Sequence, residues 1–133
     1  MTPTLKKIAS NDQLPSQADV VVIGGGIIGA CASYFLAKQG YSVALIEKGL
    51  VGAEQSSRNW GWCRQQNRDA RELPTSGLAM RLWDEMTEDL GQDLGFRRCG
   101  LRYATDDPQQ LAEWDSWRDV ARQFNVNTRM LSA

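Results

Sequence analysis

A run of glycines carries the clearest chemical signal in the sequence. Residues 24–29 read Gly-Gly-Gly-Ile-Ile-Gly, so Gly24, Gly26 and Gly29 satisfy the spacing G-x-G-x-x-G. In this pattern the first glycine permits a tight turn and the second lets the backbone approach a pyrophosphate. The third glycine lets a helix pack closely on a strand. The spacing therefore predicts a dinucleotide site at a helix N-terminus, where unpaired N–H groups favour anions.

An acidic residue lies where such a site needs one. Glu47 follows Gly29 by 18 residues and ends a second apolar run. A carboxylate there can accept hydrogen bonds from adenosine ribose hydroxyls, and it repels a 2′-phosphate, so NADP is disfavoured. These residues do not separate FAD from NAD, and a glycine-rich turn in a fold that binds nothing stays open.

The elements around the glycines predict a βαβ unit. Residues 19–23 are aliphatic and β-branched, which is typical of a strand buried on both faces of a parallel sheet. Residues 27–39 indicate a helix that Gly40 ends, and residues 42–46 indicate a second strand. The crossover between two such strands is expected to be right-handed.

The rest of the chain alternates between irregular and helical patterns. We expect a loop over residues 48–69 and a helix that begins near Pro74 and ends at Gly91. Residues 96–105 and 126–131 indicate strands.

Asp107 and Pro108 predict the start of a further helix, with the aspartate as N-cap and the proline in the first turn. An apolar stripe that includes Trp114 and Trp117 is expected to be the buried face of this helix.

Composition excludes several classes of protein. The 133 residues are 42% hydrophobic and 23% charged, which is ordinary for a globular protein. A net charge of −1 offers no basic excess for nucleic acid. The absence of histidine excludes histidine-based metal sites and Ser-His-Asp triads, and no metal site is expected. The three cysteines are expected to be free thiols in a reducing, cytoplasmic compartment, with Cys63 a small buried side chain.

Residues 19–48 resemble the opening of FAD-dependent amine and amino-acid oxidoreductases of the D-amino-acid oxidase superfamily. This superfamily includes D-amino-acid dehydrogenases, sarcosine oxidases and the β subunits of opine oxidases. The resemblance continues through residues 56–66, Ser-Ser-Arg-Asn-Trp-Gly-Trp-Cys-Arg-Gln-Gln, which are similar to the flavin-facing loop of the D-amino-acid dehydrogenase and opine-oxidase-like branch. It extends to Leu131.

The resemblance implies a cofactor, a reaction and a set of contacts. FAD would lie with its pyrophosphate over residues 24–29, and an amine or amino acid, D-configured or opine-like, would transfer a hydride from its carbon to flavin N5. The resulting imine would hydrolyse. The implied cofactor-binding residues are Gly24, Gly26, Ile27, Ile28, Gly29, Glu47, Lys48, Ser56, Ser57, Arg58, Asn59 and Trp60.

Arg64 is the candidate substrate anchor, and no catalytic side chain is assigned. It stands seven residues before the pair Arg71-Glu72, and sarcosine-oxidase-like enzymes carry a carboxylate-holding arginine at this offset from a similar pair. A guanidinium can bind a carboxylate through two parallel hydrogen bonds. A solvated loop face is the alternative. The sequence departs from the sarcosine-oxidase pattern at Gly61 and in lacking a histidine, so covalent flavin attachment through histidine is excluded.

The length of the chain is short for the family that it resembles. We expect an α/β fold with an N-terminal arm over 1–18, a Rossmann-like FAD-binding part over 19–95 with a flavin loop over 48–69, and the truncated start of an antiparallel α+β substrate domain over 96–133. The chain alone is expected to bind FAD weakly or not at all and to lack turnover.

Two other functions stay open, a non-catalytic nucleotide-binding fragment and an NAD-dependent dehydrogenase. A partner subunit or a respiratory electron acceptor, the oligomeric state and attachment to the inner face of the membrane also stay open.

Overall fold

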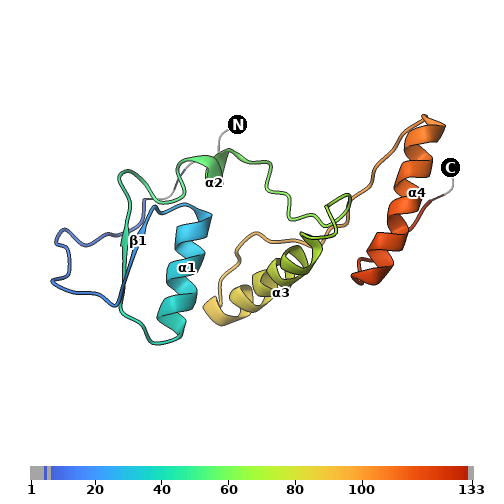
Figure 1. The fold of residues 1–133 in the computed structure, drawn as a ribbon. Coiled ribbons are helices and arrows are strands. Elements are labelled where there is room, and N and C mark those ends of the chain that lie inside the picture. The colour runs from blue at the N-terminus through green and yellow to red at the C-terminus, as the bar shows by residue number, and fades with distance from the viewer. Residues whose placement is uncertain (1–4, 6, 132–133) are drawn as a thin grey trace. The chain divides into compact units, whose positions relative to one another are not determined.

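The computed structural model describes residue 5 and residues 7–131, and Figure 1 shows the ribbon. The described residues form two compact units, one that ends at Gly61 and one that begins at Trp62. Within these residues no helix combines the length and apolar character needed to cross a bilayer.

The first unit is a βαβ unit with a short helix after it. Its elements in chain order are β1 (Val20–Ile23), α1 (Ile27–Lys38), β2 (Val43–Ile46) and α2 (Gln55–Arg58). The two strands are parallel, with Val20 opposite Val43 and Ile23 opposite Ile46. This confirms the predicted strand–helix–strand order. The four-residue helix α2 lies inside the segment that the sequence predicts to be loop.

Only one face of the two-stranded sheet is covered within this unit. The side chain of Val22 lies against Gly29 of α1. Its neighbours Val21 and Ile23 point the other way and are 59% and 88% exposed. The prediction that this strand is buried on both faces is therefore wrong for the described residues, because no element of this unit packs on the second face.

A side-chain clip joins the starts of the two strands. The hydroxyl and the backbone N–H of Ser42 both donate to Asp19 Oδ2, at 2.6 and 2.8 Å. The N–H of Asp19 in turn donates to Ser42 Oγ at 2.9 Å. The two bonds that Oδ2 accepts, the one from the Ser42 hydroxyl most, lower the pKa of the Asp19 carboxyl because they favour its ionised form.

The second unit contains two longer helices, α3 (Leu73–Leu90) and α4 (Pro108–Gln123). Both confirm predicted helices. Helix α3 begins one residue before the expected Pro74 and ends at Gly91, which adopts the left-handed conformation at φ 57°. Leu73 at its start is 1% exposed.

The sequence-predicted strands of the second unit are not formed. The described residues in 96–105 and 126–131 are irregular, and no antiparallel sheet is present there. A strand needs a neighbouring segment to complete its hydrogen-bond ladder. The only sheet among the described residues pairs β1 with β2. Glycines with positive φ at Gly95 and Gly100 also break the extended path.

Asp107 caps α4 as the sequence predicts, because its Oδ1 accepts the Gln109 N–H at 2.9 Å. We expect Asp107→Ala to lower the free energy of unfolding by about 1 kcal/mol through loss of this cap. Urea denaturation followed by circular dichroism measures the change. Asp106→Ala is the matched control, because Asp107 rather than Asp106 is the N-cap residue. Equal losses in both variants would contradict the capping role.

Candidate functional site

The turn between β1 and α1 brings two backbones into direct contact. Gly24 sits at φ +105°, a conformation that residues with a side chain rarely adopt. Its N–H donates to the Ile46 carbonyl at 2.8 Å, which ties the turn to the end of β2. A Cβ on Gly29 would overlap the carbonyl oxygen of Gly24. Only glycine at position 29 therefore lets α1 start where it does.

The N-terminus of α1 presents free donors. Gly26 is the N-cap and supplies no side chain to cap the helix. The Ile27 N–H donates to Ser56 Oγ at 2.8 Å. The N–H groups of Ile28 and Gly29 have no acceptor in the part of the chain that the structure describes. Uncapped donors at the positive end of a helix form a site for an anion.

A hollow lies beside this turn. Its volume is about 430 Å³, and it is lined by Val22, Ile23, Gly24, Gly26, Ile27, Ile28, Gly29, Ala32, Gln55 and Ser56. The lining combines apolar side chains with glycine backbone. A phosphate group can therefore approach the helix N-terminus without meeting a Cβ at Gly24 or Gly26. The residues present fit the pyrophosphate of a dinucleotide.

Glu47 is held against the glycine turn by both of its carboxylate oxygens. Oε2 accepts the Gly25 N–H at 2.7 Å and Oε1 accepts the Gly49 N–H at 2.8 Å. These bonds lower the pKa of the Glu47 carboxyl, the Gly25 bond most, because both favour the ionised form. Each oxygen keeps acceptor capacity, so the expected contact with ribose hydroxyls stays a prediction that this geometry permits.

The flavin-loop residues predicted from the resemblance fold partly onto the turn. Ser56 lies directly against the turn, because its Oγ accepts the Ile27 N–H. The same Oγ would lie 3.3 Å from a Cβ placed on Gly26. Ser57 and Asn59 bond within the loop itself. The Ser57 hydroxyl donates to the Ala53 carbonyl at 2.8 Å, and Asn59 Nδ2 donates to the Ser56 carbonyl at 2.7 Å.

The remaining predicted loop residues lie at the surface of the first unit. Arg58 forms an ion pair with Glu54 at 3.0 Å, with both side chains more than half exposed. An exposed pair of this kind contributes little to stability. Trp60 is 81% exposed and Lys48 is exposed. Their proposed contacts with a cofactor stay predictions.

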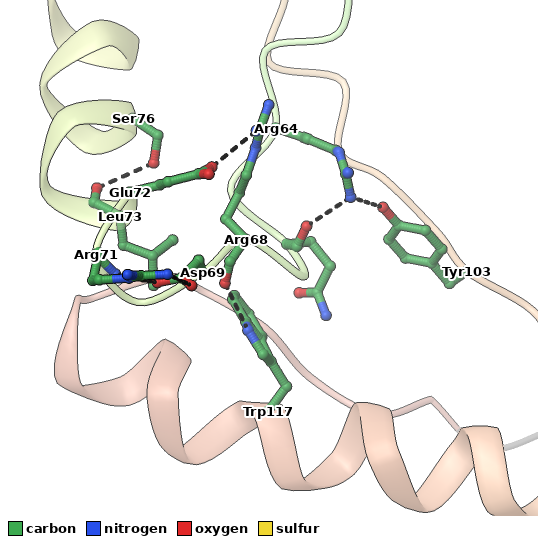
Figure 2. A network of polar contacts seen from close by, with 10 residues as sticks. Arg64, Arg68, Asp69, Arg71, Glu72, Leu73, Ser76, Tyr103 and Trp117 are labelled. Atoms are coloured by element: carbon green, nitrogen blue, oxygen red, sulfur yellow. Dashed lines mark hydrogen bonds and ion pairs between the residues drawn. The ribbon is translucent and has the colours of Figure 1, made fainter.

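Arg64 belongs to the second unit, where it is half-buried in a polar network (Figure 2). Its Nη1 donates to the Gln66 carbonyl at 3.0 Å and to the Tyr103 hydroxyl at 3.1 Å. Arg64 is therefore held by hydrogen bonds within this unit, and its role as substrate anchor stays a prediction. The sequence analysis missed Tyr103, because 39 residues separate it from Arg64 and no local pattern connects them.

The neighbouring arginines of the loop are paired with carboxylates. Arg68 bonds Glu72 at 2.9 Å, and Arg71 bonds Asp69 at 2.8 Å (Figure 2). The Arg71 side chain lowers the pKa of Asp69 to about 2. Trp117 of α4 donates its Nε1–H to the Arg68 carbonyl at 3.2 Å, so this tryptophan also fixes the loop.

The three cysteines are free thiols, as predicted, but Cys63 is exposed. The expectation that Cys63 is a small buried side chain is therefore wrong within the described residues. Its position in an irregular segment, between the exposed Trp62 and the half-buried Arg64, explains the difference, since no helix or strand there directs a side chain inward.

We expect Gly29→Ala to lower the free energy of unfolding by about 3 kcal/mol, because its methyl group would overlap the backbone of Gly24. Urea denaturation measures the loss. Gly49→Ala is the matched control, since a Cβ there would lie 3.7 Å from Glu47 Oε1, an ordinary contact. The Gly49 variant is expected to change stability by less than about 0.5 kcal/mol. A wild-type stability for Gly29→Ala would contradict the close approach.

The Glu47 carboxylate predicts a dependence of stability on pH. Its pKa is lowered from 4.5 in the folded protein, so its contribution is complete above that value and is lost as the pH falls through the lowered pKa. Glu47→Gln is expected to lose less stability than wild type between neutral and strongly acidic pH. Carboxyl ¹³C NMR titration and unfolding at a series of pH values test this. Glu113→Gln is the control for removal of an exposed carboxylate. Parallel pH profiles for wild type and Glu47→Gln would contradict it.

The chain is similar to several known proteins. The family model described as FAD dependent oxidoreductase (DAO) matches residues 19–133. The chain is 36% identical over 122 residues to the glycine oxidase of Geobacillus kaustophilus (strain HTA426), covering 84% of this chain and 32% of the relative. It is 29% identical over 94 residues to the sarcosine oxidase subunit beta of Arthrobacter sp, covering 69% of this chain and 23% of the relative.

A solved structure shows the same architecture. The L-amino acid deaminase from Proteus myxofaciens, in complex with anthranilate, is 33% identical, with a TM-score of 0.85 over 92% of this chain and 27% of that one. The chain thus spans about a third or less of the length of these relatives. Because the family model covers the glycine turn, Glu47 and Arg64 together, the chain belongs to the D-amino-acid oxidase (DAO) family of FAD-dependent oxidoreductases.

Proposed function

We propose that the protein oxidises an amine or amino acid with FAD as its cofactor. The observation that carries this proposal is the pair of N–H groups left without an acceptor at the N-terminus of α1. Ser56 accepts the Ile27 N–H, whereas the Ile28 and Gly29 N–H groups have no acceptor among the described residues, and Gly29 admits no side chain. The positive end of α1 would hold the pyrophosphate of FAD.

Glu47 would bind the adenosine ribose. Its carboxylate is kept ionised by the N–H groups of Gly25 and Gly49, and an ionised carboxylate only accepts hydrogen bonds. The two ribose hydroxyls are donors that match it, whereas a 2′-phosphate is a like charge. Ser56 would line the same site from α2, with Lys48, Ser57, Arg58, Asn59 and Trp60 along the loop that follows the turn.

Arg64 would anchor the substrate through its carboxylate. The named relatives act on glycine, sarcosine and L-amino acids, which all carry an amino group beside a carboxylate. We therefore infer an α-amino acid or an N-methyl amino acid as substrate class, with D-amino acids and opines as the further candidates that the sequence suggests. FAD, when bound, supplies the acceptor for the hydride from the substrate carbon. The residues of this chain would bind FAD and orient the substrate toward it.

The alternatives differ in what supports them. The family match disfavours an NAD-dependent dehydrogenase. A non-catalytic nucleotide-binding protein is the other candidate, since the glycine turn alone predicts binding of a dinucleotide and no reaction. Similarity to the beta subunit of a sarcosine oxidase supports a partner subunit as one route for the electrons, and a respiratory acceptor is the other.

The experiment uses the protein purified from the cells that produce it naturally and saturated with FAD. Anaerobic addition of glycine, sarcosine and D- and L-amino acids is expected to bleach the visible absorption of the flavin with at least one of them. Arg64→Lys is expected to raise KM for that substrate about 10- to 100-fold, because one ammonium cannot replace a bidentate guanidinium.

Arg129→Lys is the matched control, since Arg129 is exposed and makes no hydrogen bond or ion pair with the described residues. Tighter binding of NAD than of FAD would refute the flavin assignment. Bound FAD that no amine or amino acid bleaches would favour the non-catalytic alternative.

A further inference from the structure

The guanidinium of Arg64 is fixed at one corner and open along one edge. Both hydrogen bonds that this side chain makes with the described residues leave from Nη1, to the Gln66 carbonyl and the Tyr103 hydroxyl. Each of the two N–H groups on Nη1 therefore has its own acceptor. Nε and Nη2 have no hydrogen-bond partner among residues 7–131. These two nitrogens form an edge that can bind a carboxylate through two parallel bonds.

The acceptors that hold Nη1 are themselves held by α4 and the segment after it. The Tyr103 ring packs against Trp114 of α4, with ring centroids 5.5 Å apart and planes tilted by 51°. The side chain of Gln66 accepts the Thr128 hydroxyl at 2.6 Å. Tyr103 therefore has a ring that sets its position and a hydroxyl that acts on Arg64.

We infer that Tyr103 is a positioning residue for substrate carboxylate binding, because its hydroxyl holds Arg64 with the Nε–Nη2 edge free. This inference rests on the proposed function. A flexible arginine loses rotamer freedom when it binds a ligand, and an arginine that is already oriented loses less. The ligand class is a small carboxylate that also carries an amino group.

Tyr103→Phe tests this role, since it keeps the ring against Trp114 and removes only the hydroxyl. The probe is anthranilate, the amino-carboxylate bound by the deaminase from Proteus myxofaciens, with anthranilamide as its neutral counterpart. Binding is measured by ligand fluorescence on the FAD-loaded protein as the cell makes it. The variant is expected to bind anthranilate about 2- to 10-fold more weakly and anthranilamide as wild type does.

Turnover provides a second measurement. Tyr103→Phe is expected to raise KM for the carboxylate substrate by the same factor and to leave kcat unchanged, because the hydroxyl acts on Arg64 and not on the reacting carbon. Tyr41→Phe is the matched control, because Tyr41 lies in the first unit and is 49% exposed. It is expected to change neither constant.

A measurement without ligand tests the orientation itself. Side-chain ¹⁵N NMR is expected to show faster rotation of the Arg64 guanidinium in Tyr103→Phe than in wild type or Tyr41→Phe. Equal rotation in the three proteins would overturn the positioning role.

The outcomes separate this inference from the proposed function. Wild-type anthranilate binding in Tyr103→Phe, together with at least 10-fold weaker binding in Arg64→Lys, would overturn the role of Tyr103 alone. Unchanged binding in Arg64→Lys, or no binding of anthranilate by wild type, would overturn the carboxylate anchor and this inference with it. Equal losses for anthranilate and anthranilamide would show a general structural effect and would also overturn the inference.

Discussion

The contact between the backbones of Gly24 and Gly29 is the constraint on which the first unit depends. Because no Cβ fits at Gly29, α1 can begin directly against the turn that ends β1. This places Val22 under the helix, and the N-cap Gly26 supplies no side chain to cap α1. The same close approach thus sets the packing of the βαβ unit and leaves backbone donors at the helix N-terminus, where we propose that the pyrophosphate binds.

Residues distant in sequence complete the site through bonds to the backbone. Glu47 bonds the N–H of Gly25, and Ser56 bonds the N–H of Ile27. Both remove a backbone donor that would otherwise lack a partner. The donors left over among the described residues are the N–H groups of Ile28 and Gly29, in the first turn of α1. The exposed ion pairs of the loop, such as Arg58 with Glu54, contribute little to stability.

In the second unit, hydrogen bonds hold the charged side chain of Arg64. Arg64 lies in an irregular segment that has no ladder or helix of its own. Its orientation depends on Tyr103, whose ring packs on Trp114, and on the carbonyl of Gln66. The adjacent loop is also tied to α4, through Trp117. Helix α4 therefore acts as the support of the proposed substrate anchor, although its own residues supply no charged contact to it.

Features that depend on near neighbours in the chain could be predicted from the sequence. The βαβ unit, the glycine turn and the ends of α3 and α4 follow from periodicity and from caps such as Gly91 and Asp107, which act within one turn of chain. The prediction of a strand over 96–105 was wrong, because a strand forms only where a neighbouring segment completes its hydrogen bonds, and a local pattern does not show whether that segment is present. The tertiary structure alone decided that Glu47 is held by Gly25 and that Tyr103 meets Arg64, since such contacts depend on how the chain folds back on itself.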